Sequence, residues 1–157
     1  MSRLSRPALV GPPLVNAMIN YAALATTGPP TRAARGTGPA AEDQPVLLSR
    51  PGDEVVVRVG SVVVKAHAAG ADPDQLLARL RTAAHPALRP IALAPLPVPG
   101  AELAGLAGRI GDRWVSAWPA GTALRSEDLD DIPWEPAAAL LAALHRTRPE
   151  PDLFSAL

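Results

Sequence analysis

The stretch VVVRVGSVVVKAHA, residues 55–68, decides the fold because it predicts a β-hairpin. Two runs rich in valine flank the pair Gly60-Ser61, and glycine supplies the positive φ that a two-residue hairpin turn needs. A shorter apolar run at residues 45–49 comes before them, followed by the turn-forming residues 49–53. We therefore predict three strands in an antiparallel meander.

Lys65 stands near the end of the third predicted strand. The chain has 15 Lys plus Arg residues, and Lys65 is the only lysine among them. A lysine at a strand end often extends its ammonium group into water and has no further role. Lysine also differs from arginine as a compact point charge, so its single use favours a functional role. The residues alone leave both interpretations open.

A helix is predicted next, over residues 72–84. Asp72 is a suitable N-cap, Pro73 suits the first helical position, and Pro86 ends the helix. The following segment contains too many prolines for a central strand or a helix. We expect it to be extended, with a short edge strand at residues 91–93.

A second hairpin is predicted through Gly111-Asp112. Strand alternation then places Trp114, Ser116 and Trp118 on one face of its last strand. A helix rich in Ala and Leu follows at residues 134–147. We assign residues 46–122 to one folded unit and residues 123–157 to a linker and this helix.

Residues 1–45 are expected to form a disordered N-terminal extension. Residues 26–45 are rich in Pro, Gly, Ala and Thr and contain almost no large apolar side chains. Such a segment buries too little surface to offset the entropy lost on ordering. We expect at most a short helix near residues 15–24.

The composition excludes several classes of function. Fifteen acidic and fifteen basic residues give a formal net charge of zero, which argues against nucleic-acid binding and against a basic membrane-binding surface. The chain lacks cysteine, and its three histidines show no H-x-x-x-H spacing, so we expect no metal site. A chain without cysteine is compatible with a reducing compartment, and we expect the cytoplasm.

The order of three strands, a helix, two strands and a further helix resembles the N-terminal lobe of the protein-kinase-like fold. The phrases VVVRVGSVVVKAHA, GRIGDRWVSAWPAGTAL and PWEPAAALLAALHRT resemble bacterial aminoglycoside phosphotransferases and their choline-kinase-like relatives. The resemblance covers about residues 46–148. It implies an α+β lobe with a five-stranded antiparallel sheet and one packed helix, followed by a helix that leads to a C-terminal lobe absent from this sequence.

The resemblance implies an ATP site on this lobe. VVVK at the end of the third strand matches the V-A-I-K pattern, so Lys65 would bind the α- and β-phosphates. Gly52 would lie in the loop that covers the phosphates, although a plain hairpin turn explains it equally well. Val63 and Val115 would be apolar walls of the site. The main chain of residues 117–120, with Trp118 and Ala120, would meet the adenine edge, while core packing is the alternative for the Trp118 side chain.

In the family, an acidic residue on the helix after the third strand orients the lysine. Here that helix offers only Asp72 and Asp74, which capping explains, and a Lys65–Asp74 pair is the alternative. No H-G-D-x-x-x-x-N phrase is present, so we assign no catalytic residue and expect Mg²⁺ binding only if the missing lobe is supplied. We interpret the acidic residues between 127 and 131 as a solvated loop.

Three hypotheses remain. The first is the ATP-binding N-terminal portion of an ATP-dependent small-molecule phosphotransferase of the aminoglycoside type, inactive alone, whose C-terminal lobe is either lost or separately encoded and, if separately encoded, would be its partner. The second is a non-catalytic interaction or scaffold module derived from such a lobe, which would associate through the helix at residues 134–147. The third is an unrelated α+β domain in which Lys65 has no role. Nothing in the sequence identifies an acceptor substrate.

Overall fold

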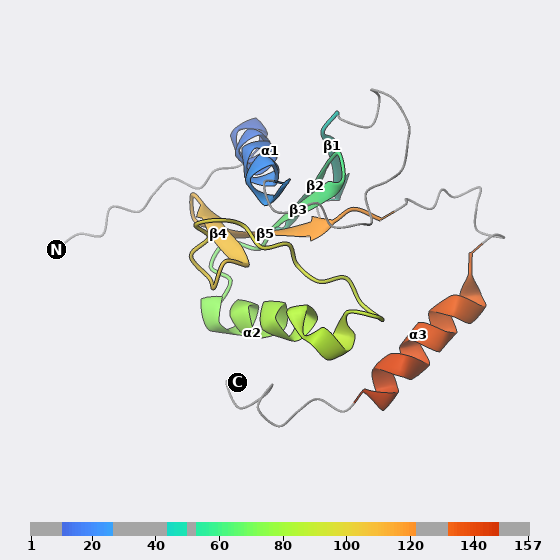
Figure 1. Ribbon diagram of the computed structural model, residues 1–157. Coiled ribbons are helices and arrows are strands. Elements are labelled where there is room, and N and C mark those ends of the chain that lie inside the picture. The colour runs from blue at the N-terminus through green and yellow to red at the C-terminus, as the bar shows by residue number, and fades with distance from the viewer. Residues whose placement is uncertain (1–10, 27–43, 50–52, 122–131, 148–157) are drawn as a thin grey trace.

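A computed structural model describes residues 11–26, 44–49, 53–121 and 132–147. These residues form an α+β structure with a five-stranded antiparallel sheet and three α-helices (Figure 1). The elements in chain order are α1 (Pro12–Thr26), β1 (Val46–Ser49), β2 (Val55–Val59), β3 (Val62–Ala66), α2 (Pro73–Ala84), β4 (Ala107–Ile110), β5 (Arg113–Pro119) and α3 (Trp134–Arg146).

Both predicted hairpins are confirmed. The turn at Gly60, with φ of 55°, joins β2 to β3, and the turn at Gly111, with φ of 63°, joins β4 to β5. The strand order is β1-β2-β3-β5-β4, so β3 and β5 lie together at the centre of the sheet. The three-stranded meander is therefore extended on the β3 side by the second hairpin.

The helix α1 corrects two expectations. Residues 1–45 were expected to be a disordered extension with at most a short helix near residues 15–24, and the sheet was expected to carry one packed helix. The helix forms, but it spans Pro12–Thr26 and packs against the sheet on the face opposite α2 (Figure 1). The side chains of Leu14, Met18 and Tyr21 are buried, and they recur at the spacing of one helical face. Asn16 and Asn20 lie on the exposed face, so they do not interrupt the apolar one.

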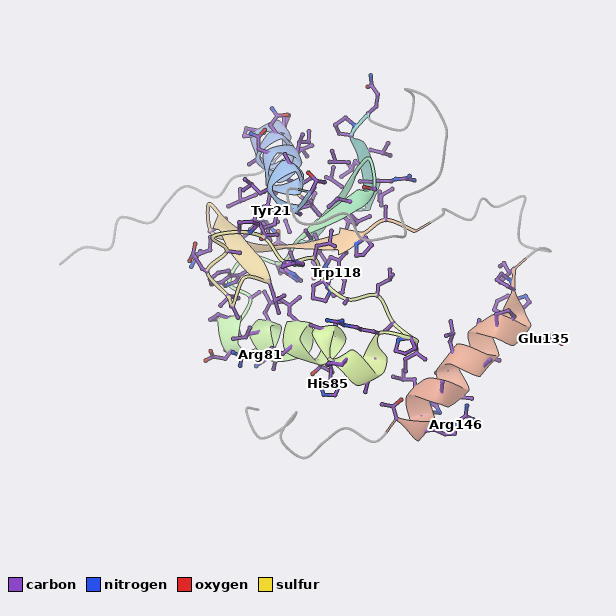
Figure 2. All side chains as sticks on the ribbon, in the orientation of Figure 1. Tyr21, Arg81, His85, Trp118, Glu135 and Arg146 are labelled. Carbon is purple, nitrogen blue, oxygen red and sulfur yellow. The ribbon has the colours of Figure 1, made fainter. Side chains whose placement is uncertain are left out.

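Gly108 on β4 shows how closely α1 approaches the sheet. A β-carbon at this position would lie 3.0 Å from Cε2 of the Tyr21 ring. A side chain at this position would crowd the ring, so α1 packs closely on β4 at this point. Figure 2 shows Tyr21 directed from α1 toward the sheet. Burial raises the pKa of Tyr21 to about 12.

The helix α2 lies over the other face of the sheet. Asp72 caps it as predicted, because its carboxylate accepts hydrogen bonds from the backbone N–H groups of Asp74 and Gln75. Leu76 and Leu80 are buried against side chains of β4 and β5. The predicted alternation on β5 is also confirmed, since Trp114 and Trp118 face α2 while Val115 and Ala117 belong to the core under α1.

The edge strand expected at residues 91–93 is absent. Those residues form a turn in which Ile91 and Ala92 donate backbone hydrogen bonds to Leu88. The proline-rich segment instead contacts the sheet at Leu96, whose N–H donates to the carbonyl of Ala117 at 2.8 Å. Prolines on both sides of Leu96 lack an N–H, which explains why the pairing stops at one bridge.

The helix α3 forms where it was predicted and carries no buried residue. Figure 1 shows it beside the sheet rather than packed on it. Among the described helices, none has the length and apolar character that crossing a bilayer requires.

Candidate functional site

The candidate site lies on the face of the sheet that α2 partly covers. Residues on this face form cross-strand rows, because successive side chains alternate between the two faces of a strand. One row joins Val56, Lys65 and Ser116, and the next joins Arg58, Val63 and Trp118. The predicted residues Lys65, Val63 and Trp118 are therefore neighbours on one surface.

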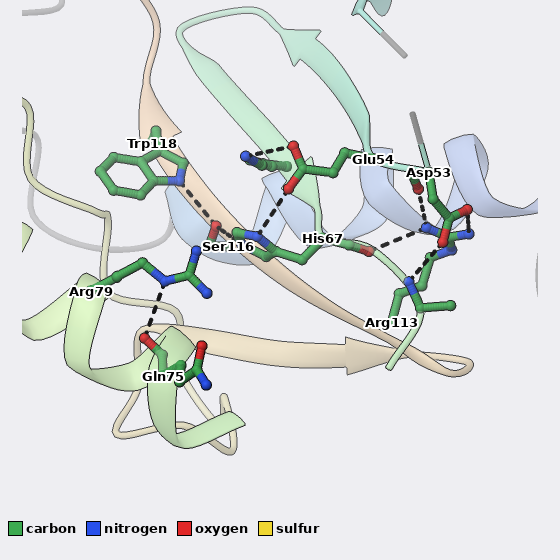
Figure 3. Close-up of polar contacts among 10 residues, drawn as sticks. Asp53, Glu54, His67, Gln75, Arg79, Arg113, Ser116 and Trp118 are labelled. Atoms are coloured by element: carbon green, nitrogen blue, oxygen red, sulfur yellow. Dashed lines mark hydrogen bonds and ion pairs between the residues drawn. The ribbon is translucent and has the colours of Figure 1, made fainter. Parts of the chain in front are cut away.

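Lys65 forms an ion pair with Glu54. The ammonium Nζ lies 2.8 Å from Oε2 of Glu54, and 34% and 30% of the two side-chain surfaces remain exposed (Figure 3). A pair as exposed as this one contributes about 1 kcal/mol or less to stability. Its main effect is on orientation, because the carboxylate holds the lysine against the sheet while leaving it accessible to solvent.

Glu54 is positioned by its neighbour in the chain. The carboxylate of Asp53 binds the buried guanidinium of Arg113, with Oδ1 2.5 Å from Nη2, and accepts the N–H of Ala69 at 2.9 Å. The side chain of Arg113 also donates to the backbone carbonyls of Asp53 and His67. These contacts fix the start of β2 against the end of β3, and the ion pair lowers the pKa of Asp53.

His67 belongs to a hydrogen-bonded group next to the Lys65–Glu54 ion pair. The indole Nε1–H of Trp118 donates to Oγ of Ser116 at 3.0 Å, and Nε2 of His67 lies 3.0 Å from the same oxygen. The Ser116 hydroxyl can accept the indole N–H and still either donate to Nε2 of His67 or accept from it, so the direction of this second bond depends on the tautomer of His67. Nδ1 of His67 lies 3.9 Å from Oε1 of Glu54.

Burial is the main cause that lowers the pKa of His67 to about 4. The positive charge of Lys65 acts in the same direction, Glu54 opposes it, and Arg79 adds a further lowering effect. His67 is therefore neutral near pH 7. Glu54, His67 and Ser116 together have the residue types of a hydrolytic triad. Ser116 has no exposed surface, however, so a substrate cannot reach its hydroxyl.

Arg79 brings a second cation to this surface. It lies on α2, and its Nε donates to the backbone carbonyl of Gln75 at 3.2 Å. Figure 3 shows its guanidinium directed toward the sheet near Ser116 and Trp118. Arg79 takes part in none of the ion pairs formed among the described residues.

The remaining predicted residues stand as follows. Gly52 lies outside the described residues. Val63 is half-buried between its strand neighbours, whereas Val115 is fully buried in the core under α1 and cannot be a wall on this face. The main chain expected to meet adenine is partly engaged within the fold, since the N–H of Ala120 donates to Ser61 at 2.8 Å and the carbonyl of Ala117 accepts from Leu96.

The sequence analysis missed Glu54 as the partner of Lys65, although the hairpin contains the signal. The turn at Gly60-Ser61 pairs Val59 with Val62, and the same register continued outward places residue 54 opposite residue 67. Glu54 then stands diagonal to Lys65 on the same face, within reach of a long side chain. Arg79 carried no comparable signal, because its position depends on how α2 packs.

Comparison with known proteins adds no assignment: no family model, curated protein or solved structure matches this chain.

Proposed function

We propose that this chain is the ATP-binding N-terminal portion of a small-molecule phosphotransferase with a protein-kinase-like N-lobe, in which Lys65 binds the phosphates. One observation carries the proposal. The only lysine of the chain lies on the third strand of the sheet, paired with Glu54 at 2.8 Å, while a third of its side-chain surface is exposed. An oriented ammonium group of this kind suits a polyanion such as a triphosphate.

The carboxylate that pairs with Lys65 comes from a different element than in the family that the sequence resembles. There the carboxylate comes from the helix after the third strand, whereas here it comes from Glu54, directly before β2. In both arrangements a carboxylate holds the ammonium group in an ion pair. Asp72 is used as the N-cap of α2, and Lys65 pairs with Glu54 in place of the alternative Asp74.

Val63 and the main chain after Trp118 would then lie near the base. We expect this chain alone to bind nucleotide and to transfer no phosphoryl group, because it contains no phrase that matches the catalytic motif of the family. The acceptor remains a small molecule of unspecified class. Phosphorylation of an acceptor by the purified chain would contradict this expectation.

The single lysine allows a direct test. An amine-reactive reagent can acetylate only Lys65 and the N-terminal α-amine, and mass spectrometry separates the two products. We expect ATP to slow acetylation of Lys65 several-fold, adenosine to leave it unchanged, and the α-amine to be unaffected by either. A Lys65 rate that is the same with and without saturating ATP would remove the proposed role, as would equal ATP binding by wild type and Lys65→Ala.

The second candidate function, an interaction module, is favoured by the surface of α3. Four large apolar side chains on this helix are at least 45% exposed, namely Trp134, Leu140, Leu141 and Leu144. Such a surface favours association. Sedimentation equilibrium over a range of concentrations, with Leu141→Glu as the comparison, separates a self-associating chain from a monomer. A wild-type chain that remains monomeric at high concentration would leave self-association unsupported.

A further inference from the structure

Arg79 is an exposed residue at the edge of the buried side of α2, which Leu76 and Leu80 form. It follows the buried residue Leu76 by three positions, which places the two on neighbouring parts of the helix surface. Its Nε bond to Gln75 leaves the two terminal nitrogens of the guanidinium directed toward Ser116 and Trp118 (Figure 3). Arg79 therefore presents up to four N–H donors above the central strands.

The charges on this surface are unbalanced. Lys65 and Arg79 each contribute one positive charge, Glu54 contributes one negative charge and His67 is neutral, so these four residues sum to +1, and Arg58 in the neighbouring row adds a further positive charge. The carboxylate of Asp53 does not change this sum, because it is paired with Arg113. Lys65 and Arg79 both lower the pKa of His67, and Figure 3 shows the guanidinium of Arg79 near Ser116, the hydrogen-bond partner of His67.

We propose that Arg79 is a second phosphate-binding residue, which together with Lys65 holds the polyphosphate of the nucleotide on this face of the sheet. This inference rests on the proposed function and specifies its ligand as a polyphosphate. Lys65 acts as a point charge, whereas the planar guanidinium of Arg79 can bind two oxygens of one phosphate. Because Glu54 already neutralises the charge of Lys65, Arg79 on α2 supplies a positive charge that remains available to a polyphosphate.

The test uses the whole chain and sodium tripolyphosphate as the probe, with ATP as the second ligand. Binding is measured by calorimetry for wild type, Lys65→Gln, Arg79→Gln and Arg81→Gln. Arg81 is the matched control, because it is an exposed arginine, as Arg79 is, and two positions along α2 place it on a different side of the helix. The thermal unfolding of each variant is measured as a control for an intact fold.

We expect Arg79→Gln to weaken binding of both ligands roughly tenfold, which is the loss of about one charge-assisted contact, and Arg81→Gln to leave it unchanged. We also expect either ligand to raise the pKa of His67, followed by NMR, and less so in Arg79→Gln.

Unchanged binding by Arg79→Gln together with weakened binding by Lys65→Gln would overturn this inference and leave the proposed function standing. Unchanged binding by both variants would overturn both. A loss confined to ATP, with tripolyphosphate binding unaffected, would show that Arg79 contacts the nucleoside and would also overturn the inference.

Discussion

Replacing leucines on α1 tests whether this helix belongs to the core. Leu14 and Leu24 lie on the same helix, and their side chains differ in exposure, at 1% and 50% respectively. Leu14→Ala and Leu24→Ala therefore make the same chemical change at a buried and at a half-exposed site. The difference between the two effects isolates the packing of α1 against the sheet.

The magnitude follows from the burial. A fully buried leucine replaced by alanine costs about 3 kcal/mol, because the lost transfer free energy adds to the cost of the cavity. At Leu24 the exposed half of the side chain contributes nothing, so the loss is about 1 kcal/mol or less. The better helix propensity of alanine reduces it by a further few tenths. We expect the free energies of unfolding of the two variants to differ by about 2 kcal/mol.

Urea denaturation monitored by tryptophan fluorescence measures both values. A shift of the midpoint without a change in the m-value shows that stability alone has changed. Equal effects at the two positions, or an effect of Leu14→Ala below about 0.5 kcal/mol, would refute the packing of α1. A chain that starts at residue 44 gives an independent check. We expect it not to fold, because it lacks the core side chains Leu14, Met18 and Tyr21.

Two further predictions concern the two faces of the sheet. Because the folded-state pKa of His67, about 4, is below its ordinary value of 6.5, the unfolded chain takes up the proton first, and we expect stability to fall by about 2 to 3 kcal/mol as the pH falls from 6.5 to 4. Urea titrations across this range should show a smaller fall in His67→Gln, and identical curves would contradict the assignment. Gly108→Ala should destabilise the protein by about 1 to 3 kcal/mol, because the new methyl group meets Tyr21 at 3.0 Å. Gly121→Ala, which has open space around it, should change the melting temperature little, and equal shifts for the two would count against this contact.

Local signals made the individual elements predictable. The two hairpins depend on glycines that accept a positive φ within a two-residue turn, and the start of α2 depends on the Asp72 cap. Each of these features involves residues that are close in the sequence, so their physical causes can be read from the residues themselves. The faces of β5 followed equally from strand alternation.

Packing between distant segments was not predictable in the same way. The apolar face of α1 shows that a helix can form, but not that the sheet offers a surface for it. The site depends on contacts such as Arg113 with Asp53, which are 60 residues apart in the chain. Glu54 is intermediate between a local signal and a distant contact. The hairpin register was sufficient to place it diagonal to Lys65, although the pair was not predicted.

The sequence by itself therefore determined the strands, their turns, the helix α2 and the single lysine on the third strand. Only the tertiary structure decided that α1 completes the core, that Glu54 is anchored through Asp53 and Arg113, and that Arg79 shares a surface with Lys65. The physical reason is that turns and caps are satisfied by neighbouring residues, whereas burial and charge pairing depend on which surfaces the folded chain brings together.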